Sequence, residues 1–152
     1  YGLDRPKKYK TLPRDVLSFQ EILRIFSLID TGSAKELRNR AALELLYSCG
    51  LRRAELERLN LSSVYFQKRR LRSASLLLSF KRYAKQARIT KNVTLHGLRH
   101  SCAAHMLAGG ADIRHIQVFL GHSCLSSTQL YTRVEISDLQ SMLDRYHPRD
   151  HF

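Results

Sequence analysis

The sequence has few of the features that mark a secreted, fibrous or membrane protein. Three prolines and seven glycines in 152 residues exclude a collagen-like or low-complexity chain. Apolar runs extend over only a few residues, which predicts neither a transmembrane helix nor the apolar core of a signal peptide. Cys49, Cys102 and Cys124 are far apart, which argues against a disulfide framework and favours a reducing compartment. The length fits one domain with its own core.

Negative charge is scarce as well. The chain has 26 lysines and arginines against 13 aspartates and glutamates, a net charge of +13. No acidic residue occurs between Arg58 and Ala111, a stretch with eleven basic residues. This pattern is typical of a protein that binds a polyanion such as nucleic acid, although a solvated basic face would give the same pattern. The candidate DNA-binding residues are Lys68, Arg69, Arg70, Arg72, Lys81, Arg82, Lys85 and Lys91.

The hydrophobic pattern predicts a mainly α chain with at most a small sheet. S-x-x-E sequences at 18–21 and 33–36 are capping boxes, which place helix starts there. Gly50 and the pair Gly109-Gly110 are expected helix ends. Residues 1–14 resemble an extended linker, and residues 63–72 suit two short strands. The predicted helices cover 19–29, 34–49, 52–59, 73–89, 95–107, 113–120, 126–134 and 137–146.

Several polar side chains are not needed by a pure scaffold. Each alone is more simply explained as packing or as a partner for a nearby carbonyl, but together they form a set of two guanidiniums, imidazoles and a phenol. They are Arg52, His96, Arg99, His122 and Tyr131.

A zinc site is one interpretation of His96 and His100, which are four residues apart. A zinc helix of the H-E-x-x-H type needs a carboxylate where this chain has Leu98 and Arg99, and a guanidinium beside Zn²⁺ is unfavourable. No cysteine cluster completes the site. The sequence therefore predicts no metal and no cofactor.

The same set suits phosphoryl transfer on nucleic acid. Two arginines can bind the non-bridging oxygens of a phosphate and stabilise the charge gained in the transition state. Imidazoles transfer protons near neutral pH. A tyrosine can attack phosphorus and form an ester that conserves the energy of the broken bond. These are the requirements of metal-free cutting and rejoining of strands.

Four sequence runs make the hypothesis specific: GLRRAEL at 50–56, HGLRHS at 96–101, LGHS at 120–123 and TQLYT at 128–132. In this order they resemble the boxes of the tyrosine recombinase family of phage-type integrases and Xer-like recombinases. The similarity covers Leu17 to about Pro148. It implies a helical catalytic domain over residues 15–152 with a small antiparallel β-sheet, and a linker over 1–14 from an absent N-terminal DNA-binding domain.

The resemblance also implies a role for each site residue. Arg52 and Arg99 would hold the scissile phosphate, His96 would assist proton transfer, and His122 would bond the phosphate. Tyr131 would be the nucleophile and form a 3′-phosphotyrosyl link. The implied partners are double-stranded DNA recombination sites and a homotetramer in which the C-terminal segment docks on a neighbouring subunit. The implied location is cytoplasmic and nucleoid-associated, without membrane contact.

One departure from the family lies between Arg52 and His96, where the interval is about half the usual span. The family has a β-hairpin there, which carries a lysine as general acid. In this sequence the strand-like segment runs directly into the helix-like one, so we infer a missing segment near Arg72/Ser73. We favour the interpretation that this sequence omits a basic loop that would be mobile without DNA. The alternative is that the protein has lost this loop. Lys68 lies too early for the catalytic lysine, and no lysine takes that role.

Two alternatives stay open. A DNA-binding relic or regulator of the same fold would bind without cutting, and only the missing lysine segment supports it. A type IB topoisomerase-like enzyme would share the chemistry but relax supercoils. The LGHS run and the short length favour the recombinase.

Overall fold

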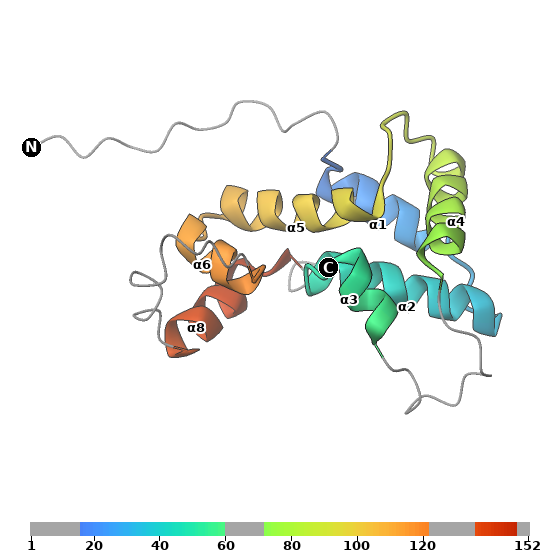
Figure 1. Ribbon diagram of the computed structural model, residues 1–152. Coiled ribbons are helices and arrows are strands. Elements are labelled where there is room, and N and C mark those ends of the chain that lie inside the picture. The colour runs from blue at the N-terminus through green and yellow to red at the C-terminus, as the bar shows by residue number, and fades with distance from the viewer. Residues whose placement is uncertain (1–15, 60–71, 122–135, 149–152) are drawn as a thin grey trace, which may run out of the picture.

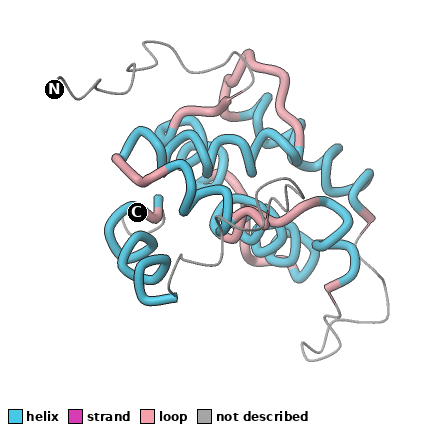
Figure 2. The backbone as a smooth tube through the Cα atoms, turned by 60° about the vertical axis from the view of Figure 1, so that its left-hand side comes forward, coloured by secondary structure: helices cyan, strands magenta, loops and turns pink. Residues whose placement is uncertain are grey.

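Helices make up the secondary structure of the computed structural model, which describes residues 16–59, 72–121 and 136–148 (Figure 1). The helices are α1 (Phe19–Ser27), α2 (Ala34–Ser48), α3 (Arg53–Arg58), α4 (Ser73–Gln86), α5 (Leu95–Gly109), α6 (Ile113–Phe119) and α8 (Ile136–Tyr146). No strand occurs within the described ranges (Figure 2), so the mainly helical fold class is confirmed for them. The predicted linker over 1–14, the strands over 63–72 except Arg72, and the helix over 126–134 lie outside these ranges.

Side-chain caps set the starts of the helices where the sequence predicts them. The Ser18 hydroxyl accepts a hydrogen bond from the Glu21 N–H at 3.2 Å, and the Glu21 carboxylate accepts one from the Ser18 N–H at 2.6 Å. Thr94 caps α5 by accepting from the Gly97 N–H at 2.9 Å. A cap of this kind contributes about 1 kcal/mol to stability. Because the caps are local, the helix starts were predictable from the sequence.

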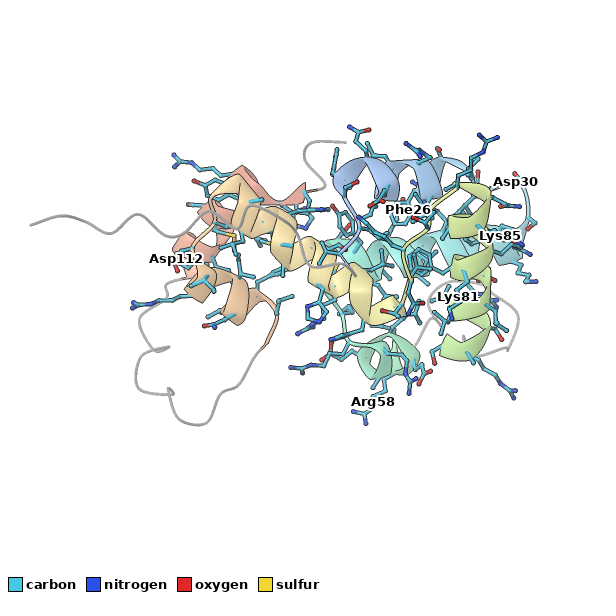
Figure 3. All side chains as sticks on the ribbon, turned by 90° about the horizontal axis from the view of Figure 1, so that it is seen from above. Phe26, Asp30, Arg58, Lys81, Lys85 and Asp112 are labelled. Carbon is cyan, nitrogen blue, oxygen red and sulfur yellow. The ribbon has the colours of Figure 1, made fainter. Side chains whose placement is uncertain are left out.

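The core lies where α2 packs along α5 in the middle of the molecule. The pair α1 and α4 lies at one end, and α6 and α8 lie at the other (Figure 1). Phe26 points from α1 toward this core (Figure 3). The largest fully buried hydrophobic side chains are Tyr47, Phe26, Phe80, Leu17, Ile22, Ile25, Leu43, Leu46, Leu76, Leu98 and Met106. Each such side chain contributes roughly 1.5–3 kcal/mol through its removal from water.

Buried polar contacts hold α5 in place. The Ser101 hydroxyl donates to the Gly97 carbonyl at 2.8 Å and accepts from the Leu17 N–H at 3.0 Å. The Tyr47 hydroxyl lies 2.8 Å from His105 Nδ1. These bonds join the second turn of α5 to the segment before α1, and its third turn to α2.

The C-terminal helix α8 packs on its own chain. Met142 is buried in the core, and Leu139, Leu143 and Tyr146 pack against it. After the helix, His147 Nε2 lies 2.6 Å from the Ser48 carbonyl oxygen at the end of α2. Docking of this segment on a neighbouring subunit stays a prediction. Among the described helices, none has both the length and the apolar character required to cross a bilayer.

Two glycines in the left-handed region close the turns on either side of the site. Gly50, with φ of +56°, follows the end of α2, and Gly121, with φ of +62°, follows the end of α6. A side chain in this conformation is strained, and glycine avoids the strain. The two turns bring the end of α6 beside the start of α3.

Alanine at these two glycines tests this arrangement. Gly121→Ala should lower the free energy of unfolding by about 1 kcal/mol, because its added methyl group would meet no atom within 4 Å and only backbone strain remains. Gly50→Ala should cost about 2 kcal/mol, because its Cβ would lie 2.6 Å from Leu120 Cδ2 and displace that side chain. Urea unfolding of both variants measures the difference. Equal losses would show that Leu120 is not tightly held.

Candidate active site

Arg99 is the buried centre of the candidate site. It stands in the second turn of α5, and only 4% of its surface is exposed. Its Nη1 donates to the Gly50 carbonyl oxygen, and its Nη2 donates to the Leu120 carbonyl oxygen at 2.5 Å. These acceptors follow the ends of α2 and α6, where free carbonyls carry partial negative charge. One guanidinium therefore ties two helix ends to α5.

Arg52 approaches the same turn from the other side. Its side chain, 48% exposed, stands at the start of α3. Its Nη2 donates to the Gly121 carbonyl at 3.0 Å. Arg99 and Arg52 thus hold the carbonyls of two successive residues, Leu120 and Gly121. Sequence positions 52, 99 and 120–121 meet at one place.

Glu55 lies beside both arginines. Its Oε2 accepts from the Arg52 backbone N–H at 2.7 Å, and its Oε1 lies 3.2 Å from Arg52 Nη1. The backbone hydrogen bond from Arg52 is the largest cause that lowers the pKa of Glu55, and the charges of Arg52 and Arg99 lower it further. The carboxylate is therefore ionised at neutral pH and offsets part of the positive charge.

The two guanidiniums are close enough to repel each other. Burial is the main cause that lowers the pKa of Arg99, and the charge of Arg52 acts in the same direction. A guanidinium nevertheless stays protonated at neutral pH. An anion held between the two arginines would relieve the repulsion, and a phosphate matches their planar, forked donors.

His96 lies at the exposed edge of the site. His96 and Arg99 are three residues apart on α5, but the structure exposes His96 and buries Arg99. Three residues turn a helix by about 300°, so the two side chains leave it about 60° apart and only one reaches the core. The His96 ring packs edge-to-face on the His100 ring, with centroids 4.3 Å apart. No group of three His, Cys, Asp or Glu side chains in the described ranges could hold a metal ion.

The structure describes only some of the remaining predicted site residues. His122 follows Gly121 directly, but His122, Tyr131, Lys68, Arg69 and Arg70 lie outside the described residues. Arg72 is exposed just before α4.

The described basic side chains on and after α4 differ in their partners. Arg82 pairs with Glu36 at 2.9 Å, and Lys91 pairs with Glu21 at 2.7 Å. Lys81 and Lys85 are exposed on α4. The structure therefore separates cations that join helices from cations that face solvent.

Two features of the site were not predicted from the sequence. Glu55 could have been, because it lies three positions after Arg52, the spacing at which a glutamate side chain accepts from the N-cap backbone N–H. The acceptors of Arg99 were not visible, because the carbonyls of Gly50 and Leu120 are backbone atoms that only the tertiary fold brings together.

Comparison with known proteins identifies the family of this chain. The model of the phage integrase family matches residues 15–74 and 67–137. The chain belongs to the phage integrase family. The first match contains Arg52, and the second contains the H-x-x-R box with Arg99 and the LGHS box. No solved structure matches the chain.

Curated relatives of this phage integrase family member include tyrosine recombinases. The chain is 35% identical to tyrosine recombinase XerC of Myxococcus xanthus over 198 residues, covering 95% of this chain and 66% of the relative. It is 33% identical to XerC of Histophilus somni (strain 2336), with coverage of 97% and 66%. It is 32% identical to XerD of Staphylococcus aureus (strain Mu50 / ATCC 700699), with coverage of 97% and 67%. The chain thus spans about two thirds of the length of these proteins.

Acidification tests the contact between Glu55 and the integrase arginines. A pKa that is lower in the folded than in the unfolded protein means that the unfolded state binds the proton more readily. The ionised carboxylate therefore stabilises the fold above its ordinary pKa of 4.5, and this contribution disappears as the pH falls below that value. Glu55→Gln should cost about 0.5–1 kcal/mol near neutral pH and progressively less below about pH 4.5.

Urea unfolding of wild type and variant across this pH range measures the effect. Asp144→Asn, which removes a carboxylate at an exposed position of α8, is the control. A cost for Glu55→Gln that stays constant down to about pH 3 would contradict the role of the charge.

Proposed function

We propose that this chain is the catalytic domain of a site-specific DNA recombinase that cuts and rejoins strands through a 3′-phosphotyrosyl intermediate. The observation that carries the proposal is the convergence of Arg52 and Arg99 on the turn at Leu120-Gly121, immediately before His122. The curated names of the relatives, tyrosine recombinase XerC and XerD, agree with it.

The described geometry supports distinct roles for the two arginines. Arg99 is buried and already bonded to two carbonyls, so it would present its outer edge to a phosphate from a fixed position. Arg52 is half exposed and would close on the other non-bridging oxygen. Charge stabilisation by fixed donors is strongest where no reorganisation is needed during the reaction.

The chemistry balances without an external energy source. The phenolic oxygen of Tyr131 forms a bond to phosphorus, and the bond from phosphorus to the 5′-oxygen breaks. His96 assists proton transfer, and His122 bonds the phosphate. The products are a 3′-phosphotyrosyl ester and a free 5′-hydroxyl. Attack by a 5′-hydroxyl from a partner strand then reverses the step and joins the exchanged strands. The two guanidiniums supply the positive charge, so the proposed reaction uses no metal or cofactor.

We also propose a missing internal segment near Arg72/Ser73 within a catalytic domain over 15–152. The family match is divided into two stretches that overlap only at residues 67–74. The match to the Myxococcus protein extends over 198 residues, although this chain has only 152. The longer alignment means that the relative has residues that this chain lacks, and the division of the family match supports their assignment to this interval. A small β-sheet with a catalytic lysine belongs to that interval.

The proposal includes the partners of the family-like enzyme. These are two double-stranded DNA sites and three further copies of the chain, with the C-terminal segment docked on a neighbour. A cytoplasmic, nucleoid-associated location and a linker role for residues 1–14 belong to the same proposal.

Substitution of the nucleophile tests the proposal. Wild-type protein incubated with a pool of nicked duplexes of randomised sequence should form SDS-resistant adducts, because the nick releases the 5′-strand and traps the ester. Tyr131→Phe should form none while its DNA affinity changes less than about twofold, because only the attacking oxygen is removed. Tyr146→Phe is the control and should retain adducts. Adducts with the Tyr131 variant would identify another nucleophile. DNA binding by wild type with no adduct would favour the non-cleaving relic.

Neighbouring arginines provide a second test. Arg52→Ala should slow adduct formation by about 100-fold or more, the typical loss when one charge-stabilising donor is removed. Arg53→Ala removes the same charge from the adjacent exposed position and should change the rate by only a few fold. Quenched time courses with EDTA present measure both rates. If the two substitutions slow adduct formation equally, Arg52 contributes only to the general attraction of DNA.

A further inference from the structure

Two exposed histidines lie together on α5, at the edge of the candidate site. His96 and His100 both face solvent, whereas the three residues between them are buried. Four residues turn a helix by slightly more than one full turn, so the two side chains leave α5 only about 40° apart. Their ring centroids are 4.3 Å apart, with the ring planes at 84°. One turn of α5 therefore brings two imidazoles together at a solvent-facing position.

A pair of imidazoles on one helix face is a suitable ligand for a divalent transition metal ion. Each neutral ring has one nitrogen with a free lone pair, and Zn²⁺, Ni²⁺ and Cu²⁺ bind such nitrogens well. At a metal–nitrogen distance of about 2.0–2.1 Å, tetrahedral geometry separates two ligating nitrogens by about 3.3 Å. Rings with centroids 4.3 Å apart reach this separation by rotation about side-chain bonds. No movement of the helix is needed.

Burial of Arg99 removes an obstacle that the sequence alone suggests. A guanidinium beside a metal ion is unfavourable, and Arg99 lies three residues after His96. Arg99 leaves α5 about 60° from His96, in the direction opposite to His100. Its Nη1 and Nη2 donate to the carbonyls of Gly50 and Leu120 in the interior. The guanidinium is therefore held against the core, away from the space between the two rings.

The number of ligands distinguishes this pair from a structural metal centre. Structural zinc has four protein ligands. Within the described ranges, no group of three His, Cys, Asp or Glu side chains could hold a metal ion. Water would therefore fill the other coordination positions, and the positive charge of the nearby arginines would weaken binding further. An ion bound in this way exchanges with solvent, which suits control of the protein by metal and not a permanent cofactor.

We propose that His96 and His100 bind a divalent transition metal ion and that the bound ion inhibits the protein. A nitrogen that donates its lone pair to a metal cannot accept a proton, so His96 would not assist proton transfer while the ion is bound. The binding of the ion does not depend on the reaction. The inhibition rests on the recombinase function proposed above, whose chemistry uses no metal.

Titration with Ni²⁺ tests the site directly. Ni²⁺ is the probe because it suits imidazole, whereas Zn²⁺ also binds thiolates such as that of the exposed Cys49. Isothermal titration calorimetry of untagged protein without DNA measures the affinity. Even the loss of a ligand's hydrogen-bond partner typically weakens metal binding by about 10–100-fold. His100→Gln, which removes a ligand, should therefore weaken it at least about tenfold.

Two further variants decide whether the metal binds at this pair. His96→Gln should weaken Ni²⁺ binding as much as His100→Gln does. His115→Gln is the matched control, because His115 on α6 has no histidine four residues away. Its affinity should equal that of wild type. Thermal unfolding in EDTA shows that the variants are folded. If wild type binds no Ni²⁺, or if both pair variants bind it as tightly as the control, the proposal is wrong.

The nicked-duplex assay tests the inhibition. Wild type should form adducts in EDTA, lose at least about nine tenths of its rate at saturating Ni²⁺, and recover when EDTA is added. His100→Gln should need at least about tenfold more Ni²⁺ for half inhibition. His115→Gln should be inhibited like wild type, which accounts for Ni²⁺ bound to DNA or to other side chains.

The outcomes separate the two proposals. Equal inhibition of His100→Gln and wild type would overturn the inhibitory role of the pair. Absence of adducts from wild type in EDTA would overturn the recombinase function but not the metal site, because the calorimetric titration uses neither DNA nor cleavage. Dependence of Ni²⁺ binding on both histidines, together with resistance of His100→Gln to inhibition, supports both proposals.

Discussion

The site depends on one buried guanidinium. A charge removed from water costs several kcal/mol unless its donors are satisfied, so Arg99 must keep its acceptors. Those acceptors are the carbonyls of Gly50 and Leu120, which follow the ends of two different helices. Because Arg99 needs both hydrogen bonds, the ends of α2 and α6 lie against α5. Arg52 contacts the same place through the Gly121 carbonyl.

The electrostatics of this assembly suit a phosphate without any further group. Arg52 lies close enough to act on the pKa of Arg99, and Glu55 only partly matches the two charges. The excess positive charge is held by rigid contacts and has an exposed edge. Binding of an anion would relieve repulsion that is present in the unbound protein, and donors that are already fixed would stabilise the charge that develops in the transition state.

Local patterns accounted for most of the helical fold. The starts of α1, α2, α5 and α6 follow caps at Ser18, Ser33, Thr94 and Asp112, because a cap depends on residues only two or three positions away. Ends were less predictable: α4 was expected to reach Ile89 but ends at Gln86, because Arg88 takes the left-handed conformation. Neither composition nor periodicity indicates a positive φ at an arginine. Which face of α5 is buried also depends on neighbours that are distant in sequence.

The order of the boxes, the positive charge and the capped helices were determined by the sequence alone, because each depends on residue type or short spacing. Only the tertiary structure decided that Arg99 is buried while His96, three residues earlier, is exposed. It also decided which cations are paired, Arg82 and Lys91, and which face solvent, Lys81 and Lys85. The reason is that burial and pairing depend on backbone carbonyls and carboxylates tens of residues away, which meet these side chains only when the helices pack.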